Sequence, residues 1–134
     1  MKTVFWKEIE EKVNALKINP GDFDLIAAIE RDGLEFGKFL AEKLSLPLKT
    51  IVLRAYNEER PPKKMHEPRL LKEIGFEAKG KKILLADKIV KSGATMETAI
   101  KILSEKGTVK IVPLAIAGKK NYCLVKTSGC IECK

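Results

Sequence analysis

The feature that most constrains the fold of this chain is the alternation of short apolar runs with amphipathic segments. A run from Phe23 to Ile29 is apolar on both faces, a segment from Leu34 to Leu44 has helical spacing, and Thr50–Leu53 is a second apolar run. Strands that are apolar on both faces and alternate with helices are typical of a parallel sheet covered on both sides. The order therefore predicts an α/β fold, a doubly wound, mostly parallel sheet with helices on both faces.

The same alternation extends toward both ends of the chain. An amphipathic helix is expected from Val4 to Ile18, before the first strand. Beyond the second strand, Lys82–Ala86 is a third strand and Asp87–Thr95 is expected to be a turn. A helix that ends near Gly107 and a strand from Val109 to Ile116 follow, and this strand tolerates its proline only at an edge or a bulge.

The stretch from Arg54 to Pro68 is polar and rich in proline, and it is too long for a plain connector. We therefore predict a mobile loop here, and a candidate lid over a site. The residues of this loop that are suited to contact a ligand are Arg54, Tyr56, Arg60, Lys63 and Lys64.

The length of 134 residues fits a single domain, with a core over residues 22–117, an N-terminal segment 1–21 and a tail 118–134. Residues 1–80 carry 15 basic and 14 acidic side chains, whereas residues 81–134 carry 11 and 4. This excess of positive charge favours an anionic partner, a small phosphorylated molecule or a nucleic acid, although a solvated lysine-rich surface explains it equally well.

Other features of the sequence indicate the growth temperature of the source organism and the location of the protein in the cell. A charged fraction of 33% without any glutamine is typical of proteins from thermophiles. No apolar run is long enough to span a bilayer, and the N-terminal residues have no apolar signal core. We therefore expect a cytoplasmic protein that has no membrane partner.

The chain has three cysteines, Cys123, Cys130 and Cys133. Their odd number and their clustering at one end argue against a secreted disulfide framework. A structural zinc site needs four ligands, and the chain adds only the distant His66 to the three thiols. Free thiols, a disulfide and a metal shared across a dimer remain the alternatives.

The most specific motif follows the third strand. Ser92, Gly93, Ala94 and Thr95 open a helix, where backbone N–H groups, two hydroxyls and the helix dipole together form an anion site. Gly93 allows the backbone to approach a phosphate closely. Asp87 is placed to accept hydrogen bonds from sugar hydroxyls or to hold a metal ion. The alternative is a helix capped by Ser92 or Thr95, with Asp87 as an incidental acid.

The segment from Ile83 to Thr95 resembles the phosphoribosyl pyrophosphate signature of type I phosphoribosyltransferases, an apolar strand, two acids, two apolar residues and a Thr/Ser-Gly-x-Thr turn. The segment Ile26–Gly37 resembles the pyrophosphate loop of that family, and its Ile-Glu-x-x-Gly-x-x-x-Gly pattern is closest to the adenine or purine branch. The stretch that begins at Arg54 is placed like the flexible loop of the family. The motifs stand in the family's order, between Asp22 and Ala117.

The resemblance implies a transferase that displaces pyrophosphate from the anomeric carbon of phosphoribosyl pyrophosphate through an oxocarbenium-like transition state, with Mg²⁺ brought by that substrate. It implies a nucleobase as acceptor, with a purine as the first expectation, and a homodimer by analogy. It assigns catalysis to Asp87 and Arg54, and substrate binding to Glu30, Arg31, Asp32, Gly33, Lys88, Lys91, Ser92, Gly93, Ala94, Thr95 and Tyr122.

The sequence departs from the family pattern in two places. Lys88 stands where the signature has its second acid, and Lys91 stands at another position that is often acidic. An ammonium group cannot accept a hydrogen bond from a hydroxyl, although Lys88 is suited to neutralise Asp87 or to reach a phosphate oxygen. The subdomain that recognises the base, the hood, is reduced, and the N-terminal helix must supply much of it, with Tyr122 to stack on a ring.

These departures leave alternatives to an enzyme open. One alternative is a regulator that binds a nucleotide or phosphoribosyl pyrophosphate without turnover, because Lys88 replaces an acid of the signature. A second alternative is a basic RNA-binding module, which the scarcity of aromatic residues disfavours.

Overall fold

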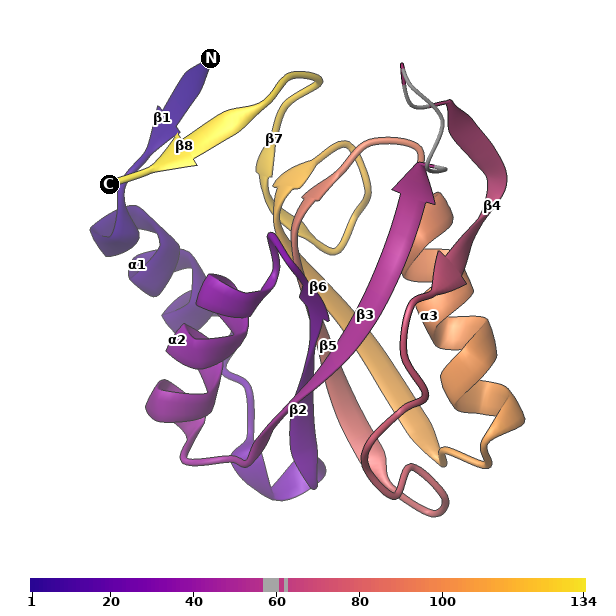
Figure 1. The fold of residues 1–134 in the computed structure, drawn as a ribbon. Helices are drawn as coiled ribbons and strands as arrows, with labels where there is room; N and C mark the ends of the chain where they lie inside the picture. Colours follow the sequence, from indigo (N-terminus) through magenta and orange to yellow (C-terminus); the bar gives the residue numbers. More distant parts are fainter. Residues whose placement is uncertain (57–60, 62) are drawn as a thin grey trace.

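The computed structural model describes residues 1–56, 61 and 63–134, and a six-stranded sheet runs through this part of the chain (Figure 1). Its strands in spatial order are β4 (Lys64–Leu70), β3 (Leu48–Tyr56), β2 (Leu25–Glu30), β5 (Lys82–Val90), β6 (Lys110–Gly118) and β7 (Cys123–Lys126). Neighbouring strands pair in parallel, except that β4 is antiparallel to β3. The predicted mostly parallel sheet is confirmed.

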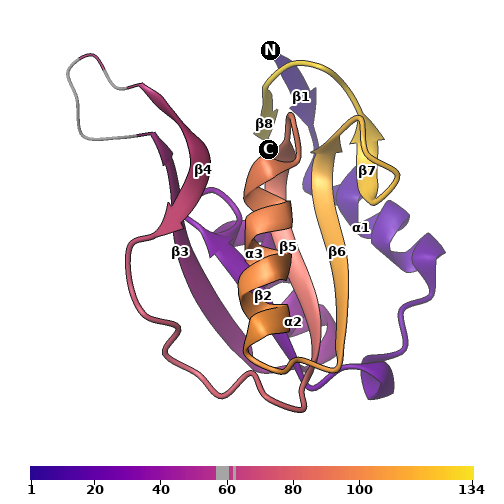
Figure 2. The same cartoon turned by 90° about the vertical axis from the view of Figure 1, so that its right-hand side faces the viewer.

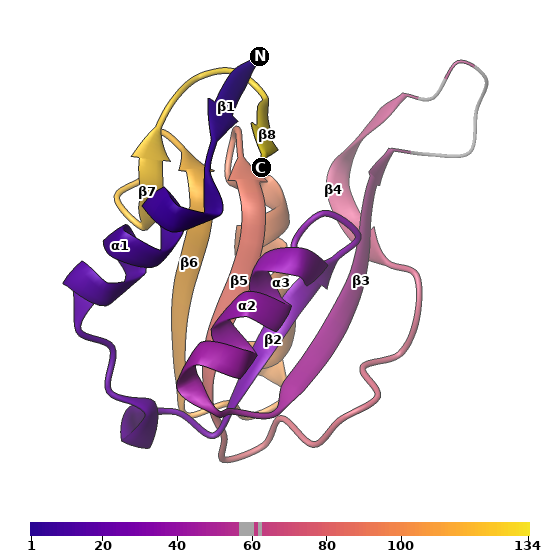
Figure 3. The same cartoon turned by 90° about the vertical axis from the view of Figure 1, so that its left-hand side faces the viewer.

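Helices cover both faces of this sheet (Figures 2 and 3). The helices α1 (Trp6–Leu16) and α2 (Leu34–Leu44) pack on one face, and α3 (Ala94–Glu105) packs on the other. Each face has its own apolar core, one centred on Phe36 and Leu40 of α2 and the other on Met96 and Leu103 of α3. The doubly wound arrangement is therefore confirmed as well.

The first helix begins at Trp6 rather than at Val4, because the residues before it form a strand. The strand β1 (Lys2–Val4) pairs in parallel with β8 (Ile131–Cys133), which lies at the other end of the chain. Figure 1 shows this two-stranded sheet beside the main one, with both termini close together. Residues 118–134 are therefore not merely a tail, since they include β7 and β8.

The prediction of a mobile loop from Arg54 to Pro68 is wrong for residues 54–56 and 64–68, which lie in strands, whereas residues 57–60 and 62 of that stretch lie outside the described residues. The strand β3 continues to Tyr56 and β4 begins at Lys64, and these two residues are paired in an antiparallel ladder. Between this pair and the pair Arg54↔Arg69 the register shifts, so that the part of β4 around Pro68 bulges. An edge strand with a bulge is a position where a sheet accepts proline. The hairpin projects beyond the carboxyl edge of the sheet (Figure 2).

The third predicted strand is longer than expected. Instead of ending at Ala86, β5 continues to Val90, because β6 runs beside it and pairs up to Val90↔Gly118. Asp87 therefore lies within a strand and not in a turn, and the connection to α3 is reduced to residues 91–93.

Pro113 lies within β6, at a point where one side of this strand is an unpaired edge, as the sequence predicts for a proline. The strand β7 pairs with β6 only from Ala115 onward, and the N–H of Ala115 donates to the carbonyl oxygen of Tyr122. Backbone nitrogens two residues apart point to the same side of a strand. The nitrogen of Pro113 therefore faces the side where β7 has not yet begun, and no ladder hydrogen bond is lost.

None of the helices in the described ranges is long and apolar enough to cross a membrane.

Candidate functional site

A cavity of about 310 Å³ opens at the carboxyl ends of the central strands, where the sequence predicts a ligand crevice. We call it the central cavity. It is lined by Asp32, Pro68, Asp87, Ile89, Val90, Lys91, Ser92, Gly93, Ala94, Thr95, Met96 and Cys130. The turn after β2, the hairpin strand β4, the end of β5 and the start of α3 therefore meet around one space.

The segment Ser92–Thr95, which we call the cradle, forms the start of α3. Gly93 is the N-cap, with φ of 93° and no side-chain cap, and its carbonyl accepts from the N–H of Glu97 at 2.9 Å. The Ser92 hydroxyl accepts from the N–H of Ala94 at 3.2 Å. The interpretation of Ser92 or Thr95 as N-cap is therefore wrong. The N–H groups of Thr95 and Met96, in the first turn, have no acceptor within the helix. They are therefore suited to bind an anion.

A lysine that sequence analysis did not select lies against the cradle. A Cβ on Gly93 would lie 3.0 Å from Cε of Lys120 and 3.6 Å from its Nζ. Lys120 belongs to the connection between β6 and β7, and its carbonyl oxygen accepts a hydrogen bond from the ammonium of Lys126. The charge excess of residues 81–134 indicated cations near an anion site, but only the chain fold identifies Lys120 as one of them.

Asp87 is the buried carboxyl group of the site, with 8% of its surface exposed. Its Oδ1 accepts from the N–H of Lys88 at 2.7 Å. Burial raises the pKa of Asp87 to about 7, against the opposing effect of this hydrogen bond, and the Asp32 carboxylate raises it further. A carboxylate from another element thus acts on Asp87, and Asp87 can accept or donate hydrogen bonds near neutral pH.

The Lys88 side chain acts on a different part of the molecule. Burial raises the pKa of the Cys133 thiol, the ammonium of Lys88 lowers it, and Glu35 raises it. The ammonium of Lys88 is thus close to Cys133 of β8, whereas the carboxyl group of Asp87 interacts with Asp32. Lys88 influences Asp87 through its backbone N–H, which donates to the Asp87 carboxylate.

The turn between β2 and α2 is pressed against β5. A Cβ on Gly33 would lie 2.5 Å from the carbonyl oxygen of Ile29, 2.9 Å from that of Ala86 and 3.0 Å from Cα of Asp87. A Cβ on Gly37 would lie 2.5 Å from Cβ of Ala28. The two glycines of the Gly-x-x-x-Gly pattern therefore permit close packing of α2 and its turn on the sheet, and this packing holds Asp32 beside Asp87.

The other predicted site residues are distributed around this centre. Glu30 ends β2, next to a cis peptide bond to Arg31, whose side chain is exposed. Arg54 is exposed on β3, where it pairs with Arg69. The exposed Lys63 immediately precedes β4. Arg60 and the side chains of Tyr56 and Lys64 lie outside the described residues.

Tyr122 does not line the central cavity. It lies between β6 and β7 and packs on the core beneath α3. Burial and the nearby Cys123 and Glu97 raise the pKa of its hydroxyl. The structure therefore gives Tyr122 a packing role, and the stacking contact predicted for it is not part of this cavity.

All three cysteines are free thiols. Cys123 is buried, Cys133 is half-buried and Cys130 is exposed at the central cavity. Among the residues that the structure describes, no group of three or more metal-ligating side chains comes together. Sequence analysis did not identify Cys130 or Pro68 as lining residues, since both reach the cavity through strand pairings that no local pattern reveals.

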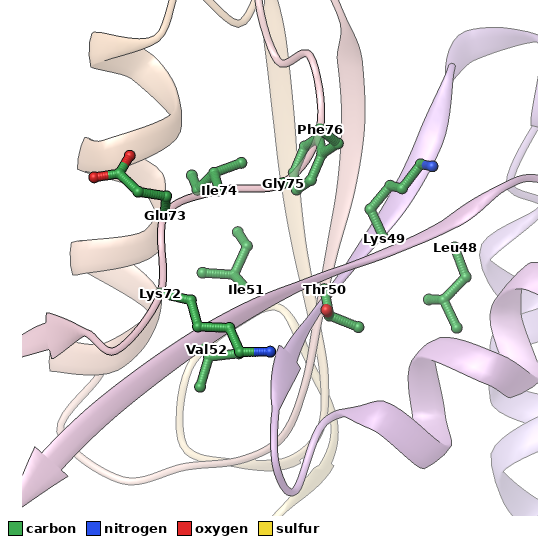
Figure 4. A pocket seen from close by; sticks show the side chains of 10 residues that line it. All are labelled: Leu48, Lys49, Thr50, Ile51, Val52, Lys72, Glu73, Ile74, Gly75 and Phe76. Atoms are coloured by element: carbon green, nitrogen blue, oxygen red, sulfur yellow. The ribbon is translucent and has the colours of Figure 1, made fainter.

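A second pocket, of about 280 Å³, lies along the edge of β3 (Figure 4). We call it the β3-edge pocket. It is bounded by residues 48–52 of β3 and by the connection 72–76, because β4 pairs with β3 only from Leu53 onward. Its charged side chains are Lys49, Lys72 and Glu73, and it contains neither a helix N-terminus nor a buried carboxyl group. The chemistry of an anion site is therefore in the central cavity.

The raised pKa of Asp87 makes the free energy of unfolding depend on pH. The unfolded chain releases this proton near pH 3.8 and the folded chain near 7, so the folded state binds more protons in between. The free energy of unfolding is therefore expected to fall as the pH rises from 4 to 7, by up to about 4 kcal/mol for this group. We expect Asp87→Asn to remove that dependence and to stabilise the protein at pH 8.

Urea unfolding at pH 5 and pH 8 measures this effect, with Glu77→Gln, an exposed acid outside the cavity, as the control. If the free energy of unfolding depended equally on pH in Asp87→Asn and in the unmodified protein, the prediction would be contradicted.

Comparisons with known proteins agree with the fold. The family model of the phosphoribosyl transferase domain matches residues 6–134. The chain therefore belongs to the phosphoribosyltransferase family, and its type I fold is confirmed.

Its relatives have several roles. The chain is 29% identical over 97 residues to a bifunctional protein PyrR of Acetivibrio thermocellus, which covers 68% of this chain and 53% of that protein. It is 28% identical over 106 residues to an orotate phosphoribosyltransferase of Sulfurisphaera tokodaii, which covers 78% and 48%. The chain thus spans about half the length of these curated relatives.

Solved structures show the same fold. A purine phosphoribosyltransferase from Pyrococcus horikoshii superimposes with a TM-score of 0.77 at 24% identity, over 99% of this chain and 93% of that one. A hypothetical protein from Neisseria gonorrhoeae with bound ppGpp superimposes with a TM-score of 0.68 at 17% identity, over 98% and 84%.

Proposed function

We propose that this protein binds phosphoribosyl pyrophosphate in the central cavity and transfers its phosphoribosyl group to a nucleobase, with release of pyrophosphate. The observation that carries this proposal is the presence of the cradle and the buried Asp87 in one cavity. A phosphate and a sugar hydroxyl are the two groups that a helix N-terminus and a carboxylate recognise. Membership of the family supports the same substrate class.

In this proposal each part of the substrate has a place. The 5′-phosphate binds the N–H groups of the cradle, with Lys91 and Lys120 nearby, and a ribose hydroxyl binds Asp87. The pyrophosphate lies at the turn 31–33, within reach of Arg31. Holding the anomeric carbon and the leaving group in fixed positions, while polar groups stabilise the developing charge, is the main source of rate acceleration.

The residues of the cavity fit a hard divalent cation. Asp32 and Asp87 both line the cavity and provide carboxylate oxygens, the ligand type that Mg²⁺ prefers. A bound Mg²⁺ supplies neutralisation of the negative charge on the pyrophosphate. The ion is proposed to arrive with that substrate rather than to reside in the protein.

A binding protein without turnover is the second candidate, and the position of Lys88 favours it. Lys88 stands where the family signature has an acid, and its ammonium acts on the pKa of Cys133 rather than facing the cavity beside Asp87. One carboxylate that would hold the ribose is therefore missing. A regulator built in this way would bind phosphoribosyl pyrophosphate and release no pyrophosphate.

One assay separates the two candidates. The protein is incubated with phosphoribosyl pyrophosphate, Mg²⁺ and each of a panel of nucleobases, and pyrophosphate release is followed. We expect release with at least one base, and a loss of at least about 100-fold in Asp87→Asn, since this variant lacks a group that contacts the reacting sugar. Glu77→Gln is the matched control. Binding without release under any base would establish the regulator instead.

We also propose a homodimer, by analogy with the family. Sedimentation equilibrium of the full chain tests this proposal, and a mass near 30 kDa, twice the 15.0 kDa of one chain, is expected. A mass of one chain at micromolar concentration would contradict it.

A further inference from the structure

The β3-edge pocket contains a strand edge that β4 leaves open. The strand β4 pairs with β3 from Leu53 onward, and the N–H of Leu71 then donates to the carbonyl oxygen of Val52 at 2.9 Å. Beyond this contact the chain leaves β3 and passes its edge as the connection 72–76 (Figure 4). Residues 48–52 of β3 therefore pair with β2 on one side and face the pocket on the other.

The backbone groups that face the pocket follow from the strand pairing. The carbonyl oxygen of Pro47 accepts from the N–H of Ile26, so residues 47, 49 and 51 direct their backbone groups to β2, and residues 48, 50 and 52 direct theirs outward. In the described part of the chain, the outward N–H and C=O of Thr50 form no hydrogen bond. Unpaired backbone groups on a strand edge are a template for one more strand.

The space beside this edge is an apolar groove. Ile51 is buried in the core under α3, and Ile74 and Phe76 of the connection are half-buried against the same core. A hollow of about 350 Å³ shares Lys49, Gly75 and Phe76 with the β3-edge pocket and continues past the start of β3. We call the two spaces together the edge groove. It runs along the strand, as an extended chain would.

The charge along the edge groove favours an acidic occupant. Of its three acids, Asp24 accepts from a backbone N–H at 2.8 Å, Glu77 accepts from another at 3.1 Å, and Glu73 points away from β3 (Figure 4). Within the described ranges, none of its lysines forms an ion pair with an acid. These lysines are Lys49, Lys72 and Lys81. A carboxylate of a partner would complement them.

We propose that the edge groove binds an extended, acidic segment of another protein as an added strand along residues 48–52 of β3. Main-chain hydrogen bonds to Thr50 supply affinity, and alternate side chains supply specificity. Lys49 and Ile51 are two residues apart and point to the same face of the sheet, so the segment carries an acidic and an apolar side chain at the same spacing. The groove shares no lining residue with the central cavity, so this inference is independent of the proposed function.

A synthetic peptide tests the inference. The probe is a fluorescent, capped peptide in which threonines alternate with glutamate, valine and glutamate, a pattern that reads the same in both strand directions. Fluorescence anisotropy is expected to show saturable binding, and exchange of both glutamates for lysine is expected to weaken it about 10-fold or more. The amide chemical shifts of Thr50 and Val52 are expected to change with the peptide, and those of Gly93 and Ala94 are expected to remain unchanged.

The variant Thr50→Pro removes the outward N–H and keeps the pairing with β2, because an edge position accepts proline where its nitrogen faces away from the ladder. It is expected to weaken peptide binding about 10-fold or more. Thr50→Val keeps the N–H and is the matched control, with unchanged affinity.

The variant Lys49→Glu tests the charge separately and does not depend on the folding of Thr50→Pro. It is expected to reverse the preference, so that the lysine peptide binds more tightly than the glutamate peptide. Lys101→Glu, at an exposed lysine on α3, controls for the change in net charge and is expected to keep the original preference.

Three results would overturn the inference. The first is that the glutamate peptide does not bind saturably, and the second is that Thr50→Pro and Thr50→Val bind it equally well. The third is a dimer that Thr50→Pro converts to a single chain, since a second copy of this chain would then cover the edge. Loss of ribose 5-phosphate binding in the unmodified protein would contradict the proposed function alone.

Discussion

Gly93→Val is expected to reduce the affinity of the protein for ribose 5-phosphate about 100-fold, which corresponds to about 3 kcal/mol. Gly93 has a φ of 93°, a conformation that a β-branched side chain adopts only with strain. The added side chain also meets Lys120, whose Cε would lie 3.0 Å from the new Cβ. Because the cradle must rearrange to relieve both effects, its N–H groups no longer converge on one phosphate. Calorimetric titration with ribose 5-phosphate measures this loss.

Gly80→Val is the matched control. Gly80 has a similar φ of 74°, but a Cβ there would meet nothing within 4 Å, and the residue does not line the central cavity. We expect both variants to lose about 1–2 kcal/mol of stability from backbone strain, and only Gly93→Val to lose the ligand. Similar affinities of the two variants would contradict the assignment of the phosphate to the cradle.

Gly33→Ala is expected to lower the free energy of unfolding by about 3 kcal/mol or more, because the added methyl group has no space. Gly33 has a φ of −80°, which alanine adopts freely, so backbone conformation adds no penalty. The three nearest atoms all belong to backbone, at Ile29, Ala86 and Asp87, and backbone cannot move aside as a flexible side chain can. The turn must therefore separate from β5. Urea unfolding at pH 7 measures the change.

Gly75→Ala is the control for Gly33→Ala, since a Cβ at Gly75 would meet nothing within 4 Å. It is expected to change stability by less than about 0.5 kcal/mol. The separation of the turn also moves Asp32 away from Asp87, so Gly33→Ala should lower the raised pKa of Asp87 as well. A stability loss equal to that of Gly75→Ala would show that the turn is not pressed against the sheet.

Sequence analysis predicted correctly those elements whose signals are local, that is, carried by residues close together in the chain. The helix Leu34–Leu44 was expected with the bounds that the structure has, because its apolar stripe and the Leu46-Pro47 break are both local signals. The cradle was located for the same reason. Its chemistry needs only a glycine and small residues between a strand and a helix, all adjacent in the sequence.

The elements that sequence analysis missed depend on partners distant in the chain. The extension of β5 to Val90 depends on β6, and β1 exists because β8 lies beside it. The hairpin β3–β4 was interpreted as a mobile loop because its prolines and charges resemble a loop, although an edge strand accepts both. The proximity of Lys120 to Gly93 depends on a connection 27 residues further along the chain.

The central claim is that a sugar phosphate binds the N–H groups at the start of α3. Amide chemical shifts of the ¹⁵N-labelled protein during titration with ribose 5-phosphate test it most directly. The largest chemical-shift changes are expected for the amides of Gly93, Ala94, Thr95 and Met96. The amide shifts of Gly75 and Phe76 in the β3-edge pocket are expected to remain unchanged. Changes confined to the β3-edge pocket, or no changes at millimolar ligand, would contradict the claim.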